Sequence, residues 1–184
     1  SLVSSVGPCK LILSMELEPY QALIKSVIFQ QLRPASASAI FNRFTQCFDD
    51  NFPIAKQILV TPKNKLKECG LSTNKLATII EIANQEENEG LENRKGFEIM
   101  SDIQIIQKLT KIKGIGEWTA QCYLLACLGR RDAWPGSDLG LQTAIQNVKS
   151  LDKRPNLLTT NEIADSWKPY RGVAALILWS TYDV

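Results

Sequence analysis

The chain has 184 residues, of which 45% are hydrophobic and 22% are charged, and its formal net charge is +2. This length suits one domain with a buried interior, and the balance is that of an ordinary globular protein. No apolar run reaches the roughly 18 residues that a membrane-spanning helix needs, and no N-terminal signal is visible. We therefore expect an intracellular protein without membrane association, and the small net charge identifies no acidic partner.

Several kinds of catalysis are excluded by missing side chains. The chain contains no histidine, which rules out histidine metal sites and Ser–His or Cys–His nucleophilic catalysis. The five cysteines are Cys9, Cys47, Cys69, Cys122 and Cys127. Their number is odd and they form no CxxC pair, so neither a disulfide framework nor a zinc site is indicated. Reduced thiols are expected for an intracellular protein.

Apolar residues recur at helical spacing through the first half of the chain. The predicted helix starts, each marked by a proline or a polar capping residue, are Pro19, Pro34, Thr61–Pro62 and Ser72 or Thr73. Gly70 is expected to end one of these helices, because glycine readily takes the left-handed conformation that follows many helices. The polar, glycine-containing segment 85–96 is predicted to be a loop.

The second half of the chain continues the helical pattern. Ser101–Asp102 is predicted to cap a helix, and Asp138 precedes another. Thr160 is predicted to cap a helix that Pro169 interrupts before the last one begins. No sustained period-two alternation and no Asn-Gly hairpin is found. The sequence therefore predicts an all-α fold of about nine or ten helices.

One connection between two predicted helices has an unusual composition, KIKGIGEWTA at residues 111–120. Gly114 and Gly116 permit a sharp reversal, since glycine tolerates positive φ and close backbone approach. Ile115 between them is expected to turn into the core. The alternative is an ordinary antiparallel helix pair with glycine in its loop, because glycine punctuates many connections.

The same turn has features that favour phosphate binding. The helix that starts near Glu117 presents unpaired backbone N–H groups and a positive dipole end, which suit a phosphate oxygen. Lys111 and Lys113 add positive charge, and Thr119 adds a hydroxyl group. Such a turn would hold a nucleic-acid backbone without reading its sequence.

Several stretches together resemble a known family. They are VGPCKL, PYQALIKSVIFQQL, GLSTNKLATIIEIA, LTKIKGIGEWTA, RDAWPGSDLGL (131–141) and WKPYRGVAALILW (167–179). In this order they are similar to the helix-hairpin-helix DNA glycosylases, and within them to the alkylpurine branch, 3-methyladenine DNA glycosylase II. The resemblance implies a single domain over 1–184, with two lobes around a cleft. It places the hairpin at 102–129 and a Gly/Pro loop with the catalytic aspartate at 130–141.

Asp138 is the catalytic residue that the resemblance implies. Breaking the bond between a base and deoxyribose passes through a cation-like sugar, which a nearby carboxylate stabilises. The structural alternative is a helix N-cap, and the two roles can coexist. Relatives that also cut the strand carry a lysine where this chain has Trp118. The resemblance therefore implies a monofunctional enzyme that hydrolyses the bond and leaves an abasic site.

The target nucleotide must leave the duplex before its base can be cut. By resemblance, Leu32 with Gln31 beside it is the wedge that fills the gap, and Trp118 and Trp179 form an aromatic pocket for a cationic base. The alternative for Leu32 and for Trp179 is that the side chain packs in the core. Further pocket positions are Cys122 and Leu139, which make the pocket less aromatic than is usual in the family.

The resemblance also implies partners and a cofactor. The expected partner is double-stranded DNA with alkylated bases such as 3-methyladenine and 7-methylguanine, bound by a monomer in the bacterial cytoplasm or nucleoid, or in a nucleus. No cofactor is required, although family hairpins often hold Na⁺ or K⁺ on backbone carbonyls, here those of Thr110, Ile112 and Ile115. Two alternatives are a non-catalytic DNA-binding hairpin module and a glycosylase for mismatched or oxidised bases.

Overall fold

A computed structural model describes residues 17–49 and 51–181, and every regular element in these two ranges is an α-helix. The helices are α2 (Pro19–Phe29), α3 (Pro34–Gln46), α4 (Ala55–Val60), α5 (Lys63–Glu68), α6 (Thr73–Asn88), α7 (Arg94–Ile99), α8 (Asp102–Leu109), α9 (Glu117–Ala126), α10 (Leu139–Val148), α11 (Leu157–Asp165) and α12 (Arg171–Ser180). The all-α prediction is confirmed. Within the described ranges, none of the helices combines the length and apolar character that crossing a bilayer requires.

Most predicted helix boundaries are confirmed by their local chemistry. Helices α2 and α3 begin at Pro19 and Pro34. The hydroxyl groups of Ser72 and Ser101 each accept the backbone N–H three residues on, at 3.3 Å, and so cap α6 and α8. Gly70 follows α5 with a φ of +97°. Short polar side chains and glycine therefore set these ends, as capping chemistry predicts.

The prediction of a loop over 85–96 is wrong at both ends, and only residues 89–93 lie outside the helices. Helix α6 continues to Asn88, and α7 starts at Arg94 with Asn93 as its N-cap, whose side chain accepts the Gly96 N–H at 2.9 Å. The polar residues at both ends lie on partly or fully exposed helix surface, which carries no apolar periodicity of its own. Phe97, which is fully buried, is the residue that fastens α7 to the core.

The prediction that Thr160 caps a helix is also wrong. Asn156 is the N-cap of α11, and its side chain accepts the Thr159 N–H at 3.0 Å. Thr160 lies inside the helix and is fully buried. Helix α4, which the apolar spacing did not predict, is short and buries mainly Ala55 and Ile58.

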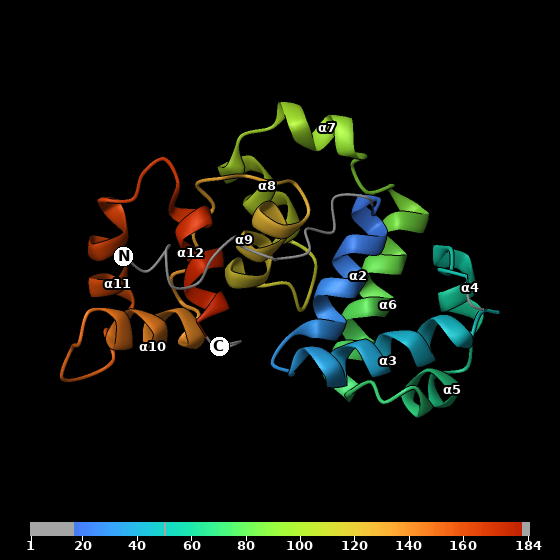
Figure 1. The fold of residues 1–184 in the computed structure, drawn as a ribbon. Helices are drawn as coiled ribbons and strands as arrows, with labels where there is room; N and C mark the ends of the chain where they lie inside the picture. The colour runs from blue at the N-terminus through green and yellow to red at the C-terminus, as the bar shows by residue number, and fades with distance from the viewer. Residues whose placement is uncertain (1–16, 50, 182–184) are drawn as a thin grey trace.

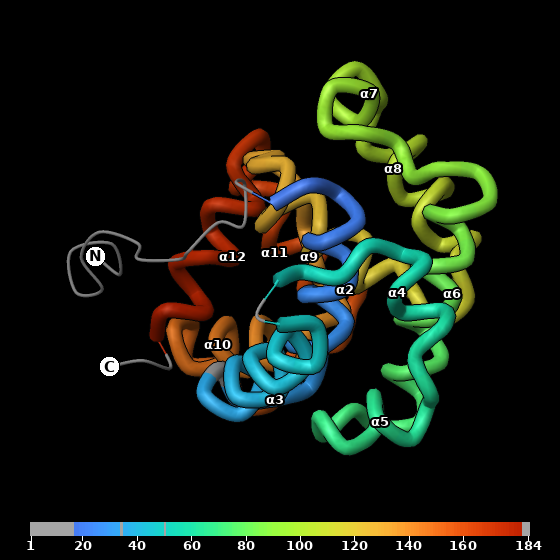
Figure 2. Tube along the Cα trace, turned by 90° about the vertical axis from the view of Figure 1, so that its right-hand side faces the viewer, coloured from blue at the N-terminus to red at the C-terminus, as the bar shows by residue number. Residues whose placement is uncertain are grey.

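The helices form two groups joined by the hairpin α8–α9 (Figures 1 and 2). In one group α2 packs against α3 and α6, and α6 packs against α4 and α5. In the other, α10 packs against α11 and α12. Helix α9 contacts both α8 and α2. The hairpin is thus the element that brings the end of α2 close to the segment that carries Asp138.

Helix α2 lies at the centre of the larger group. Its Leu23, Ile24, Val27 and Ile28 are fully buried, and such a side chain stabilises the fold by roughly 1.5–3 kcal/mol. On α9, Tyr123 is buried and its ring packs edge-to-face on Phe97 with centroids 5.8 Å apart. These contacts fix where α2 ends and where α9 begins, the two places from which the site is built.

Candidate active site

The hairpin turn is built around Gly114. Its φ is +96°, a conformation that L side chains rarely adopt, and a Cβ there would collide with the side chain of Thr78 on α6. The turn is closed by the Ile115 N–H, which donates to the Ile112 carbonyl at 3.0 Å. Ile112 and Ile115 are each only 4% exposed, so the expectation that Ile115 turns into the core is confirmed.

The outer part of the turn is open. Gly116 is the N-cap of α9, has a φ of −91°, and would meet no atom within 4 Å if it carried a Cβ. Because it has no side chain to accept a hydrogen bond, the first amides of α9 face outward without a side-chain cap. Lys113 is exposed beside them. This combination suits an anion such as a DNA phosphate.

Thr119 is placed differently from an outward-facing phosphate contact. Its side chain is only 4% exposed, and its hydroxyl oxygen accepts a 2.7 Å hydrogen bond from Gln30 Nε2. Gln30 is the residue that follows α2. Thr119 therefore connects the start of α9 to the end of α2, a structural role that sequence spacing could not show.

Gln31 and Leu32 follow Gln30 and are exposed at the connection between α2 and α3. Gln31 has a φ of +53°, and the Leu32 side chain is part of the exposed apolar surface. Behind them, Lys75 Nζ on α6 donates to the carbonyls of Ile28 and Gln30, both at 2.8 Å. A cation at the negative end of a helix stabilises that end, so Lys75 braces the connection that carries Leu32.

Asp138 caps α10 and is the meeting point of the site. Its Oδ1 accepts the Leu141 N–H at 2.8 Å, which confirms the N-cap. The same oxygen accepts the indole N–H of Trp179 at 3.1 Å, and Oδ2 accepts the indole N–H of Trp118 at 3.0 Å. Three donors from α9, α10 and α12 thus fix the plane of the carboxylate. A carboxylate can accept about four hydrogen bonds, so Oδ2 keeps room for one more.

The other predicted pocket residues also lie near Asp138. Leu139 is the next residue and its side chain is 60% exposed. Cys122 lies one turn after Trp118 on α9, and burial, followed by the charge of Asp138, raises the pKa of its thiol above the usual range. Cys122 is therefore a neutral thiol beside the carboxylate. The structure brings Asp138, Trp118, Trp179, Cys122 and Leu139 together.

The segment that leads to Asp138 is fastened to the start of α12. Arg171 donates to Asp132 through Nε at 2.9 Å and through a terminal nitrogen at 2.7 Å, and its backbone N–H donates at 3.1 Å. The Gly172 N–H donates to the Arg131 carbonyl at 2.8 Å. The pair therefore holds the start of α12, the helix that carries Trp179. Sequence reasoning missed Asp132, Arg171 and Lys75, whose side chains match no local motif.

Neither an acidic nor a cysteine-based metal site is found in the described part of the chain. A monovalent cation can be held by neutral carbonyl oxygens alone. Binding of Na⁺ or K⁺ by the carbonyls of Thr110, Ile112 and Ile115 remains a prediction. The Ile112 carbonyl already accepts one N–H and keeps its second lone pair.

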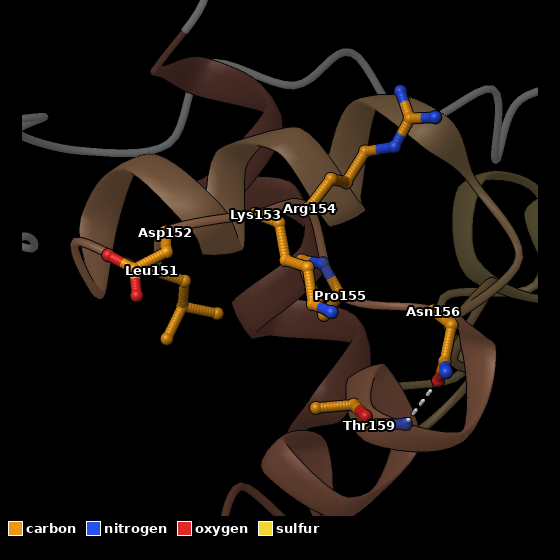
Figure 3. A pocket seen from close by; sticks show the side chains of 7 residues that line it. All are labelled: Leu151, Asp152, Lys153, Arg154, Pro155, Asn156 and Thr159. Carbon is orange, nitrogen blue, oxygen red and sulfur yellow. Dashed lines mark hydrogen bonds between the residues drawn. The ribbon is translucent and has the colours of Figure 1, made fainter.

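A separate surface hollow of about 490 Å³ lies at the connection between α10 and α11 (Figure 3). It is lined by Leu151, Asp152, Lys153, Arg154, Pro155, Asn156 and Thr159. The side chains of Lys153 and Arg154 point away from each other in Figure 3, so their charges do not converge on one ligand. It contains none of the predicted site residues.

Comparison with known proteins agrees with this geometry. Residues 24–169 match the model of the HhH-GPD superfamily base excision DNA repair proteins. The alkylbase DNA glycosidase-like protein mag2 of Schizosaccharomyces pombe is 36% identical over 97% of this chain and 85% of its own length. The DNA-3-methyladenine glycosylase 1 of the same organism is 34% identical over 98% of this chain and 80% of its own.

Two solved structures extend the likeness to the fold. The 3-methyladenine DNA glycosylase Mag1 of S. pombe in complex with abasic DNA superposes with a TM-score of 0.93, at 32% identity, over 100% of this chain and 90% of that one. A DNA-3-methyladenine glycosidase of Bacillus halodurans gives 0.75 at 30% identity, over 91% of this chain and 76% of that one. The chain belongs to the HhH-GPD superfamily of base excision DNA repair proteins, in the branch of the 3-methyladenine DNA glycosylases.

Proposed function

We propose that this protein is a monofunctional DNA glycosylase that everts alkylated purines from duplex DNA and hydrolyses their glycosidic bonds, as a first step of base excision repair. The observation that carries the proposal is Asp138, held by two indole N–H groups beside the hairpin. The relatives at 34% identity and at a TM-score of 0.93 are named as 3-methyladenine glycosylases, which supports the same activity here.

DNA would be held mainly by backbone contacts. The uncapped start of α9 and the exposed Lys113 offer one phosphate site, and the exposed Arg33 lies beside Leu32 on the other loop. The Gln30–Thr119 hydrogen bond ties these two loops together. Leu32 would enter the base stack in place of the everted nucleotide. The relative Mag1 was solved with abasic DNA, which supports DNA as the partner here.

Asp138 would act on the sugar. As the bond to the base lengthens, positive charge develops on the deoxyribose, and a carboxylate about 4 Å away stabilises it by ~4 kcal/mol at an effective dielectric near 20. That gain corresponds to a rate increase of roughly a thousandfold. The remaining acceptor position on Oδ2 can orient the attacking water. No lysine stands at the Trp118 position, which supports simple hydrolysis without strand cleavage.

An alkylated purine suits a site that offers a carboxylate and two indole rings. Methylation at a ring nitrogen makes the base a cation and a good leaving group, so little acid assistance is needed. The faces of Trp118 and Trp179 attract such a cation more strongly than a neutral base. Their N–H groups hold Asp138, which would act on the sugar, and their ring faces are the candidates for contact with the base.

The test is release of free bases from randomly methylated duplex DNA, measured by chromatography. We expect wild type to release 3-methyladenine and 7-methylguanine, and Asp138→Asn to lose at least a hundredfold in rate while still binding a duplex with an abasic-site analogue. Asp152→Asn, which changes an exposed carboxylate away from the site, is the matched control. Equal release by wild type and Asp138→Asn would remove Asp138 from the mechanism. Binding without release by any variant would favour the non-catalytic DNA-binding alternative.

A further inference from the structure

Two cysteines far from the active site lie in direct contact. Cys47 follows α3 and Cys69 follows α5, and their sulfur atoms are 2.8 Å apart. Both are free thiols. A disulfide bond has a length of about 2.05 Å, so the two sulfurs need to approach by less than about 1 Å to bond.

The two helix ends that carry these thiols are already held together. Arg43 on α3 donates from Nε to the Cys69 carbonyl at 2.9 Å. A Cβ at Gly70 would lie 2.8 Å from the Arg43 guanidinium, so the backbone after Cys69 packs directly on that side chain. The thiols therefore meet in a fixed geometry rather than by chance encounter of two mobile segments.

A small solute can reach the pair from the protein surface. A surface hollow of about 430 Å³ is lined by Arg43, Gln46, Cys47, Asp49, Lys65, Glu68 and Cys69. Cys47 is partly exposed there, whereas Cys69 is only 2% exposed. Burial, together with the contact with Cys47, raises the pKa of Cys69 to about 12. Cys69 thus keeps its proton, and Cys47 is the thiol that a dissolved oxidant meets first.

We propose that Cys47 and Cys69 form a redox site, in which a hydroperoxide converts the two thiols to a reversible disulfide bond. Cys47 Sγ, having released its proton, attacks one peroxide oxygen and the O–O bond breaks. This step gives a sulfenic acid on Cys47, and the leaving oxygen takes up the proton. Cys69 Sγ then attacks Cys47 Sγ, the S–O bond breaks, and the hydroxyl leaves as water with the Cys69 proton. Two thiols and one hydrogen peroxide become one disulfide and two waters.

The bond would act on stability rather than on the reaction at Asp138. It would close the loop between Cys47 and Cys69 in the unfolded chain, which disfavours unfolding. Helix α3 has 13 residues and is about 20 Å long, so the bond forms at the end of α3 opposite Leu32. We expect the midpoint of thermal unfolding to rise by roughly 5–10 °C, with base release changed less than twofold.

The experiment treats the full-length chain with hydrogen peroxide and maps the cysteines by mass spectrometry after trypsin digestion. Wild type should lose two hydrogens and yield a linked pair of peptides, 44–56 and 68–75, which a dithiol reductant separates. Cys47→Ser and Cys69→Ser should each abolish the linked pair and the thermal shift, whereas Cys127→Ser, a buried cysteine elsewhere in the fold, should retain both.

Three results would overturn the proposal. One is that both thiols stay free while a surface-accessible model thiol is fully oxidised. Another is that Cys47 accumulates as a sulfinic acid or a mixed disulfide without linking to Cys69. The third is a wild-type disulfide that joins Cys47 to a cysteine other than Cys69. Unfolding temperatures of the reduced serine variants show that each one is folded before oxidation.

Discussion

The indole N–H of Trp118 donates a 3.0 Å hydrogen bond to Asp138 Oδ2. The aromatic residue expected to contact the base therefore also supports the carboxylate that we propose as catalytic. Trp179 supports the other oxygen from a different helix. The ring and the N–H of each tryptophan thus have different proposed roles, which substitutions can test independently.

Trp118→Phe keeps an aromatic face but removes the donor to Asp138. Hydrogen bonds to charged groups contribute about 1.5–3 kcal/mol, so we expect single-turnover base release to slow roughly 10- to 100-fold. Trp134→Phe is the matched control, because its indole also donates a hydrogen bond, to Asn161 at 3.1 Å, but away from Asp138. That variant should lose stability and keep its rate. A wild-type rate in Trp118→Phe would show that only the ring matters.

The two glycines of the hairpin predict opposite outcomes. Gly114→Ala places a side chain on a left-handed backbone, where its Cβ collides with Thr78. This substitution should lower the free energy of unfolding by roughly 2–4 kcal/mol. Gly116→Ala has open space and should cost about 1 kcal/mol or less. Chemical denaturation measures both.

Gly116→Ala should nevertheless bind DNA more weakly, since its methyl group projects where a phosphate backbone would approach. The dissociation constant for an abasic duplex, measured by fluorescence anisotropy, tests this expectation. An unchanged constant in a folded Gly116→Ala protein would mean that the mouth of the hairpin does not face the DNA.

Lys75→Met removes the ammonium group that binds the carbonyls of Ile28 and Gln30 while keeping most of the side-chain volume. The loop with Leu32 should then be less well positioned, and release from duplex DNA should fall roughly tenfold. Release from single-stranded methylated DNA, where no wedge is needed, should fall much less. The exposed Lys63→Met is the control. Equal losses on both substrates would indicate a general structural defect instead.

The Asp132–Arg171 pair predicts a pH dependence of stability. Hydrogen bonds from Arg171 hold the pKa of Asp132 below its ordinary value of 3.8. Its stabilisation is therefore fully present above pH 4–5 and is lost as the pH falls through the lowered pKa, because the unfolded chain binds the proton more tightly. At neutral pH the partly exposed pair contributes roughly 1 kcal/mol.

Asp132→Asn should lower the free energy of unfolding at pH 7 and flatten its decline between pH 5 and pH 2. Urea denaturation at each pH measures this free energy. Asp165→Asn is the control, because the Lys168–Asp165 pair is more exposed and should matter little. Asp132→Asn should also slow base release, because Arg171 begins α12, the helix that carries Trp179. A decline identical to that of wild type would show that other carboxylates dominate the acid response.

Local chemistry in the sequence accounts for much of the fold. Prolines at 19 and 34, serine caps at 72 and 101, and Gly70 mark helix ends where the structure has them. These signals act within four residues, so they can be recognised without a tertiary structure. The errors fall where such signals are weak. The exposed end of α6 has no apolar face to detect, and Thr160 could not be distinguished from a cap by its type alone.

The same division holds for the site. The sequence by itself determined the all-α class, the Gly-Ile-Gly turn and the aspartate after it, because each depends on residues close together in the chain. Only the tertiary structure decided that Trp118 and Trp179, 20 and 41 residues from Asp138, donate to opposite oxygens of its carboxylate. It also decided that Thr119 faces Gln30 across 89 residues, and that Lys75 braces the end of α2. Such contacts are set by how helices pack against one another, and no local pattern encodes the partner of a side chain on another helix.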